Sequence, residues 1–93
     1  MNTAHKGRRA EHKARRLLED AGFLVVRSAG SKGPIDLVAW AATGCRFVQV
    51  KSGARTITPE ERRDLQRLPR PHGATVEVWH YRPRCVAPHI ERL

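Results

Sequence analysis

Acidic, cysteine and aromatic residues are all scarce in this sequence. The two cysteines, Cys45 and Cys85, have no paired spacing that would indicate a disulfide framework or a zinc site, so we expect ordinary buried or half-buried thiols in a reducing compartment. Aromatic residues make up only 5% of the chain, and most fall in predicted strands, so a platform that stacks single-stranded bases is not indicated. Apolar runs reach only strand length and none follows Met1, so we expect no membrane span, no signal peptide and a cytoplasmic location.

Positive charge is abundant. Lys and Arg total 18 against 9 Asp and Glu, which gives a formal net charge of +9 over 93 residues. This imbalance predicts a polyanionic partner, and the excess of Arg over Lys suits phosphate because the guanidinium fork matches two phosphate oxygens. A GC-rich genome would also enrich arginine, and composition does not separate the two explanations. The length fits a single domain over 1–93, with the tail from about 83 left unassigned.

An amphipathic helix is predicted near the N-terminus, over 3–21, with Gly22 as its stop. Its inward face is formed by apolar residues at helical spacing, which are Ala10, Ala14, Leu17, Leu18 and Ala21. Its opposite face is formed by basic residues, which are Lys6, Arg8, Arg9, Lys13, Arg15 and Arg16. Glu11 is the single acid within that basic run, so i,i+4 pairs do not balance its charge. The basic face is either solvated or in contact with nucleic acid.

The rest of the chain alternates between strands, turns and one further helix. The predicted elements are a strand over 23–27, a hairpin with its loop over 41–44, a helix over 58–68 and an alternating strand over 74–81. Thr58 and Glu61 form a capping box at the start of that helix, whose inward residues are Leu65 and Leu68. In the tail, Ile90 and Leu93 are candidates for docking. The order α-β-β-β-α-β indicates an α/β or α+β domain with one sheet flanked by helices.

The predicted hairpin brings three polar side chains together. If Trp40 and Cys45 close it, Asp36 faces Gln49, and Lys51 points to the same side. The other face then carries only apolar residues, which are Ile35, Leu37, Ala39, Val48 and Val50. A shift of one residue would mix the two faces. The pattern therefore predicts an acid, an amide and an amine in one cluster.

Such a cluster suits the hydrolysis of a phosphodiester. Polar groups within apolar strands are costly unless paired, and a divalent metal with a phosphate would pair with all three. Asp36 would anchor Mg²⁺, the Gln49 amide oxygen and the Val50 carbonyl would be further ligands, and Glu11 would add a carboxylate directly or through water. Lys51 would orient the water and stabilise the developing charge. The plainer alternatives are a structural Asp36–Lys51 pair and an ion pair of Glu11 along its helix.

These residues carry a resemblance to a known family. Asp36 followed by Gln49-Val50-Lys51 resembles the signature of the PD-(D/E)XK nuclease superfamily, in which an acid precedes Glu or Asp, any residue, and Lys. Glu11 on a basic first helix, the run GFLVVRSAGS at 22–31 and the run IDLVA at 35–39 resemble the archaeal-type Holliday junction resolvases and their phage relatives. The resemblance covers about 8–81 of the chain.

The resemblance implies a restriction-endonuclease-like fold with a mixed central sheet. It also implies a homodimer that cuts four-way DNA junctions with Mg²⁺, or Mn²⁺ as a substitute, without a small-molecule cofactor, in the cytoplasm of a cell or phage-infected host. The implied active site consists of Glu11, Asp36, Gln49 and Lys51. Arg27, Ser28 and Ser31 would line it or contact phosphate, although the serines are alternatively turn formers. Further candidates for DNA contact, with solvated side chains as the alternative, are Arg8, Arg9, Lys32 and Arg55.

Gln49 departs from the family pattern, which has glutamate at this position. Glutamine keeps one ligand oxygen but removes a charge, so we expect weaker metal binding, which Glu11 would offset in part by moving closer. Two alternatives remain open on the sequence. One is a nuclease of the same fold that acts on nicked, branched or duplex DNA, and the other is a catalytically weak, basic DNA-binding module.

Overall fold

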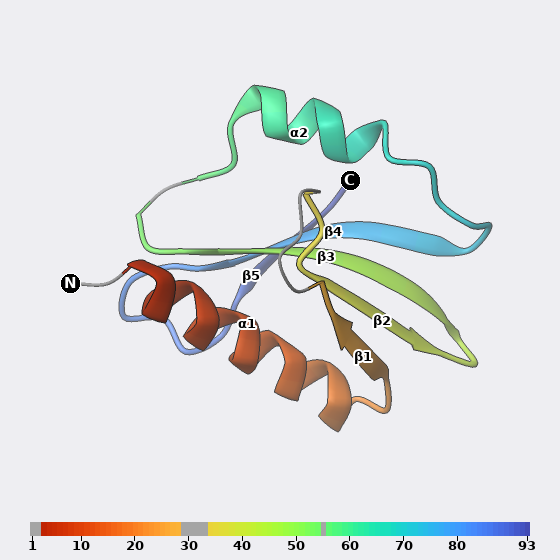
Figure 1. Cartoon of the computed structure of the whole chain (residues 1–93), viewed down its shortest axis with the longest axis horizontal. Coiled ribbons are helices and arrows are strands. Elements are labelled where there is room, and N and C mark those ends of the chain that lie inside the picture. Colours follow the sequence, from red (N-terminus) through yellow and green to blue (C-terminus); the bar gives the residue numbers. More distant parts are fainter. Residues whose placement is uncertain (1–2, 29–33, 55) are drawn as a thin grey trace.

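The computed structural model describes residues 3–28, 34–54 and 56–93 (Figure 1). Within these ranges the chain forms two helices and five strands. In chain order they are α1 (Thr3–Asp20), β1 (Leu24–Arg27), β2 (Leu37–Ala41), β3 (Gly44–Ser52), α2 (Pro59–Gln66), β4 (Ala74–Tyr81) and β5 (His89–Arg92). The predicted order is confirmed, and β5 is an additional strand in the unassigned tail.

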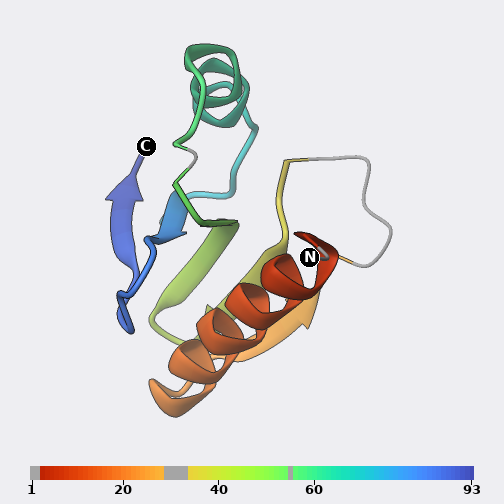
Figure 2. The same cartoon turned by 90° about the vertical axis from the view of Figure 1, so that its left-hand side faces the viewer.

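The strands form one mixed sheet in the order β1-β2-β3-β4-β5. The first three are antiparallel neighbours, β4 lies parallel to β3, and β5 is antiparallel to β4. A parallel pair needs a crossover connection, and here the crossover contains α2. The side view shows α1 and α2 on opposite faces of the sheet (Figure 2). The α/β class with a mixed, helix-flanked sheet is therefore confirmed.

α1 covers one face of the sheet with small side chains. Ala10, Ala14 and Leu18 recur at four-residue spacing and are at most 5% exposed. They pack on Leu37 of β2 and Val48 of β3, both of which are fully buried. Burial of this apolar stripe holds the helix on the sheet, because most of the stability of a helix in a protein comes from the packing of its apolar face.

Two residues that were predicted to face inward do not. Leu17 is 46% exposed, because it lies at the margin of the buried stripe of α1. Ala21 is exposed because the helix ends at Asp20, before it. Gly22 follows with a φ of +95°, which is the left-handed conformation expected of a glycine that ends a helix.

α2 begins with the predicted capping box. Thr58 Oγ1 accepts a 3.1 Å hydrogen bond from Glu61 N, and Glu61 Oε1 accepts a 3.0 Å bond from Thr58 N. The fully buried Leu65 and the partly buried Leu68 pack against the face of the sheet opposite to α1. The helix ends at Gln66, slightly before the predicted end.

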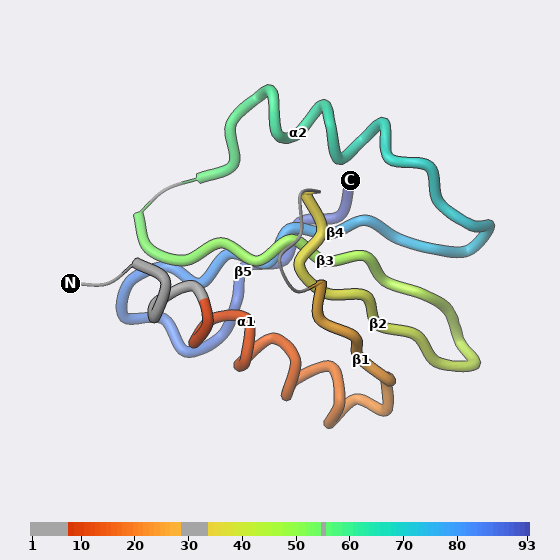
Figure 3. The backbone as a smooth tube through the Cα atoms, in the orientation of Figure 1, coloured from red at the N-terminus to blue at the C-terminus, as the bar shows by residue number. Residues whose placement is uncertain are grey.

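The register of the β2–β3 hairpin is the predicted one. Trp40 pairs with Cys45, and Leu37 pairs with Val48. Ala41 and Gly44, which were expected in the loop, also pair, so the turn is shorter than predicted. The tube view shows how this tight turn leads one strand back along the other (Figure 3).

The predicted alternation fails just before β2. Ile35 was expected beside Leu37, but it packs on the other side of the sheet, in the cluster under α2. The chain bends at Asp36, whose N–H donates a 2.9 Å hydrogen bond to Val48 O although Val48 faces Leu37. This local departure from the register turns Ile35 to the opposite face and makes that prediction wrong.

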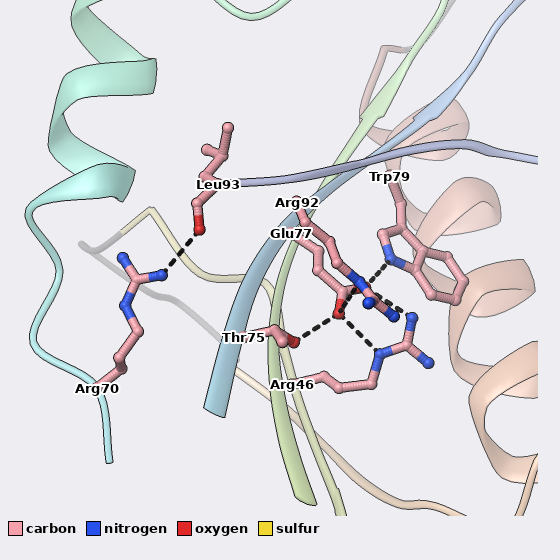
Figure 4. Close-up of polar contacts among 7 residues, drawn as sticks. All are labelled: Arg46, Arg70, Thr75, Glu77, Trp79, Arg92 and Leu93. Atoms are coloured by element: carbon pink, nitrogen blue, oxygen red, sulfur yellow. Dashed lines mark hydrogen bonds and ion pairs between the residues drawn. The ribbon is translucent and has the colours of Figure 1, made fainter. Parts of the chain in front are cut away.

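β5 and the residue after it close the far edge of the sheet. Leu93 N donates a 2.8 Å hydrogen bond to Val76 O, and Leu93 O accepts a 3.0 Å bond from Arg70 Nη1 (Figure 4). The Leu93 side chain packs into the cluster under α2, as expected. Ile90 is 42% exposed, so the expectation that it docks is wrong.

A fully buried carboxylate lies in the sheet on the side of α1. Glu77 accepts two hydrogen bonds from Arg46, at 2.9 and 2.7 Å, and single bonds from Thr75 Oγ1 at 2.6 Å and Trp79 Nε1 at 2.9 Å (Figure 4). Arg92 adds an ion pair at 3.8 Å. We call these five residues the Glu77 cluster; it joins β3, β4 and β5.

The two cysteines are free thiols. Cys45 is half-buried in β3, but Cys85 is exposed in the β4–β5 connection, which differs from the predicted burial. As for membranes, neither α1 nor α2 combines the length and the apolar character that a bilayer-spanning helix requires.

Candidate active site

Asp36 lies where three strands meet. Its carbonyl oxygen accepts a 2.9 Å hydrogen bond from Ser28 N, which follows β1. Its side-chain Oδ2 accepts a 2.7 Å bond from Val50 N in β3. The carboxylate is thereby held against the backbone of the residue between Gln49 and Lys51. The chain bend at Asp36 therefore does two things. It turns Ile35 to the other face of the sheet, and it positions the Asp36 carboxylate against β3.

The electrostatic surroundings of Asp36 include several predicted site residues. Burial raises the pKa of its carboxyl above the ordinary value of 3.8, and the Val50 N–H acts in the opposite direction. The Glu11 carboxylate also raises this pKa, whereas Lys51 and Arg27 lower it. A carboxylate whose charged form is disfavoured by burial gains from a neighbouring cation, because the cation restores the stabilisation that water no longer gives.

Gln49 is a buried polar residue on the face of β3 that α2 covers. Its side chain is 8% exposed, and its Oε1 has no hydrogen-bond partner among the residues that the structure describes. It lines a hollow together with Pro34 and with two carboxylates of α2, Glu61 and Asp64. Leaving a buried amide oxygen without a partner costs about 1–3 kcal/mol. A hydrogen-bond donor or a cation that binds beside Gln49 Oε1 would remove this cost.

Lys51 forms an ion pair with α2. Its Nζ donates a 2.6 Å hydrogen bond to Glu61 Oε2, while Glu61 Oε1 accepts from the N–H of Thr58. The hydrogen bond from Lys51 and that from Thr58 lower the pKa of Glu61 below its ordinary value. A single carboxylate thus joins the candidate catalytic amine to the start of the helix.

Glu61 is a residue that the sequence reasoning assigned only to helix capping. The signal that would have found it is the short connection between Lys51 and the helix start. That connection returns the first turn of α2 over the end of β3, so an acid in the first turn of α2 meets the lysine.

Glu11 pairs across elements and not along its own helix. Its Oε1 accepts a 3.0 Å hydrogen bond from Arg27 Nε of β1, and the two side chains are 23% and 48% exposed. The structure therefore brings two predicted site residues together beside Asp36, whose pKa both influence. Charge balance at i,i+4, which was not expected in α1, does occur between Arg15 and Glu19, at 3.2 Å.

The predicted DNA contacts fall into two groups. Arg8, Arg9, Arg27 and Ser28 are exposed, and a hollow between α1 and β1 is lined by residues that include Arg8, Glu11 and Arg27. The remaining candidates, which are Ser31, Lys32 and Arg55, lie outside the described residues.

The donor set of the site suits a hard cation that is held weakly by the protein alone. Among the described residues, no three His, Cys, Asp or Glu side chains gather into a metal-binding group. Mg²⁺ does not need such a group, because one or two carboxylates with water and substrate oxygens complete its coordination. The Asp36 carboxylate and the unpartnered Gln49 Oε1 are oxygen donors of that kind. The residues present therefore fit the group in type and number.

Comparison with known proteins places this arrangement in one family. The sequence model described as "Archaeal holliday junction resolvase (hjc)" matches residues 2–73. A protein named crossover junction endodeoxyribonuclease Hjc, from Methanocaldococcus jannaschii, is 38% identical over 63 residues, which are 68% of this chain and 47% of that protein. The chain therefore spans about half the length of this curated relative.

The fold agrees with the sequence match. The crystal structure of Hjc from Archaeoglobus fulgidus, described as a Holliday junction resolvase from an archaeal hyperthermophile, superposes with a TM-score of 0.75 at 29% identity. The match covers 94% of this chain and 72% of that chain. The resemblance stated from the sequence is thus confirmed, and the PD-(D/E)XK superfamily is consistent with it. The chain belongs to the archaeal Holliday junction resolvase (Hjc) family.

Proposed function

We propose that this protein is a divalent-metal-dependent endonuclease that hydrolyses phosphodiester bonds in four-way DNA junctions. The observation that carries the proposal is the Asp36 carboxylate, fixed by Val50 N beside Gln49 and Lys51 in a chain of this family. The net charge of +9 supports a DNA substrate. The location that we propose with it is the cytoplasm of a cell or of a phage-infected host.

Each site residue has a role that follows from its chemistry. Asp36 and the Gln49 amide oxygen would hold Mg²⁺, or Mn²⁺ as its substitute, with the Val50 carbonyl as a further ligand and Glu11 in reach directly or through water. When bound, this ion supplies charge neutralisation at the phosphate and an activated water. Lys51 orients that water and stabilises negative charge on the phosphoryl oxygens. Glu61 holds the Lys51 ammonium in place before DNA arrives.

The partners in this proposal are branched double-stranded DNA and a second copy of the chain. A four-way junction has two-fold symmetry, so a two-fold dimer presents one site to each of two strands. An apolar strip on β1 and β2 supports this assembly: Leu24, Val26 and Trp40 are 63%, 51% and 40% exposed, and Leu24 pairs with Trp40. Sedimentation of wild type and of Val26→Glu tests it, and we expect the variant to be monomeric.

The catalytic proposal is tested by cleavage of a labelled four-way junction with and without Mg²⁺. Asp36→Asn and Lys51→Ala should each reduce cleavage by more than about 100-fold, because each removes a group that acts on the reacting phosphate. Junction binding, measured by gel shift without metal, should be largely unchanged. Asp20→Asn is the matched control, since it makes the same chemical change at the exposed end of α1.

Unchanged cutting by both variants would refute the assigned site. Nicked, branched and plain duplex DNA in the same assay distinguish the alternative substrates. Tight junction binding by the wild type, with no cleavage of any of these DNAs in Mg²⁺ or Mn²⁺, would instead identify a basic DNA-binding module.

A further inference from the structure

A further hollow lies on the side of the sheet that α1 covers, away from Gln49. It has a volume of about 510 Å³ and is formed by one side of α1, the loop after β3 and the β4–β5 connection. This connection lies beside α1, whose residues Arg9, Ala10 and Lys13 line the same hollow. The residues of this connection, from 82 onward, lie beyond the segment that the family model matches, which ends at residue 73.

The charge of this hollow has one sign. Four of the residues that line it are basic and exposed, namely Arg9, Lys13, Arg82 and Arg84. Of its described lining residues none is acidic, and none of the four basic side chains forms an ion pair with a described residue. Four unneutralised cations around one concavity raise the local concentration of anions.

One residue that lines the hollow carries an unused hydrogen-bond donor. Tyr81, at the end of β4, is only 5% exposed, and its hydroxyl has no hydrogen-bond partner among the described residues. Burial raises the pKa of this phenol to about 12, so it keeps its proton at neutral pH. Lys13 Nζ lies 5.8 Å from the centre of the same ring. A tyrosine hydroxyl that is buried normally has a partner, and an oxyanion that enters this hollow would bring an acceptor towards it.

Arg84 occupies a backbone position that does not favour arginine. Cys85 N donates a 3.1 Å hydrogen bond to Arg82 O, which closes a turn with Pro83 at its second position and Arg84 at its third. Arg84 has a φ of +65°, whereas glycine or asparagine is preferred at this place in such a turn. The turn therefore carries a cationic side chain into the rim of the hollow at some conformational cost.

We propose that this hollow binds the phosphodiester backbone of a duplex DNA arm, at a site separate from the one formed by Asp36 and Lys51. The inference rests on the proposed function for the identity of the polyanion. Ser52 and Gly53, which line the hollow, directly follow Lys51 in the chain. A duplex arm bound in this hollow would therefore be continuous with the DNA strand that lies at the active site.

The test removes the two arginines of the turn with little change to the backbone. Arg84→Gly leaves a residue that the positive φ favours, and Arg82→Gln keeps a polar side chain of similar length. Binding of a four-way junction and of a duplex is followed by fluorescence anisotropy in metal-free buffer, over roughly 50–200 mM salt. Removal of one arginine–phosphate interaction should reduce the slope of log K against log salt by about 0.9, so the slope of the double variant should fall by about 1.8.

Arg63→Gln is the matched control, because it removes one exposed arginine from α2 that lines none of the three hollows described above. Its slope should equal that of the wild type. Because the slope is measured without metal, it remains informative even if the wild type cuts nothing.

A second measurement locates the binding site. Titration of inorganic phosphate should shift the NMR amide signals of Gly53 and Cys85 in the wild type, and less in Arg84→Gly and Tyr81→Phe. Salt slopes of the turn variants equal to that of Arg63→Gln would overturn the proposal. Phosphate shifts that persist together with such unchanged slopes would assign the hollow to a phosphate-bearing ligand other than DNA, which would also overturn it.

Discussion

Two buried polar groups in the same sheet are treated in opposite ways. Glu77 lies on the side of α1, is fully buried, and both of its carboxylate oxygens accept hydrogen bonds within the Glu77 cluster. Gln49 lies on the side of α2 and is nearly as buried, yet its Oε1 has no partner among the described residues. A satisfied group of this kind contributes to specifying the fold, whereas an unsatisfied one is retained at the expense of stability. On this criterion Glu77 is a structural residue and Gln49 is a candidate functional residue.

The comparison predicts that removal of Glu77 is the most damaging single change. Glu77→Ala leaves the half-buried Arg46 guanidinium without its partner, and breaking a pair with a buried carboxylate in this way costs about 3–5 kcal/mol. Urea denaturation measures the loss, with Glu19→Ala as the control, because the exposed Arg15–Glu19 pair is worth only about 0.5 kcal/mol. Similar losses in both variants would show that the Glu77 cluster does not stabilise the fold.

The stability that Glu77 provides should depend on pH in a defined direction. Burial pushes its pKa upward, but hydrogen bonds from Arg46, Thr75 and Trp79 outweigh this effect, so the folded pKa lies below the ordinary value of 4.5. Its contribution is therefore fully present above pH 4.5 and is lost as the pH falls through the lower, folded pKa. The gap in unfolding free energy between wild type and Glu77→Gln, about 2 kcal/mol at pH 7, should shrink on acidification; a gap that widens would contradict this.

Removal of the buried polar group at Gln49 should raise the unfolding free energy, whereas removal of Glu77 should lower it. Gln49→Met replaces an amide whose oxygen has no partner among the described residues by an apolar side chain of similar length, so we expect a gain of about 1 kcal/mol in unfolding free energy. Metal-stimulated cleavage should be lost at the same time, because the ligand oxygen is gone. Gln49→Glu is the companion variant and should keep cleavage, with half-maximal activity at lower Mg²⁺. A variant Gln49→Met that is less stable, or that still cleaves, would remove the contrast with Glu77.

The Lys51–Glu61 pair is expected to contribute least to stability. Its side chains are 26% and 35% exposed, so Glu61→Gln should cost less than about 1 kcal/mol. Its effect should appear in catalysis, as slower cleavage, because the Lys51 ammonium is no longer held in place by a carboxylate. Asp64→Asn is the control, because Asp64 lines the hollow beside Gln49 together with Glu61. A decrease of several kcal/mol in the unfolding free energy of Glu61→Gln would show instead that the pair holds α2 on the sheet.

Much of the fold was predictable because the signals were local. The spacing of Ala10, Ala14 and Leu18, the capping box at Thr58 and the alternation in β4 each depend on neighbouring residues. The hairpin register followed from the tight turn between Trp40 and Cys45. β5 was not predictable, since it is short, and three of its four residues are exposed.

The sequence allowed the residues of the candidate site to be predicted, but not most of the contacts that they make. Asp36, Gln49 and Lys51 were singled out because polar residues interrupt apolar strands. The bend at Asp36, which takes its N–H out of register and sends Ile35 to the other face, depends on hydrogen bonds to β3 that no local pattern indicates. The pairs Lys51–Glu61 and Glu11–Arg27 join elements that are brought together only by the crossover and by the packing of α1.

The mixed order of the sheet has a consequence for how the protein reaches its native state. The antiparallel strands from β1 to β3 connect neighbours in sequence, so they can assemble early. Pairing of β3 with β4 must first close the long segment that includes α2, which carries a larger entropy loss and is slower. We expect the face of β3 that carries Gln49 to be covered last, so the polar residues of the candidate site reach their final positions only at the end of folding.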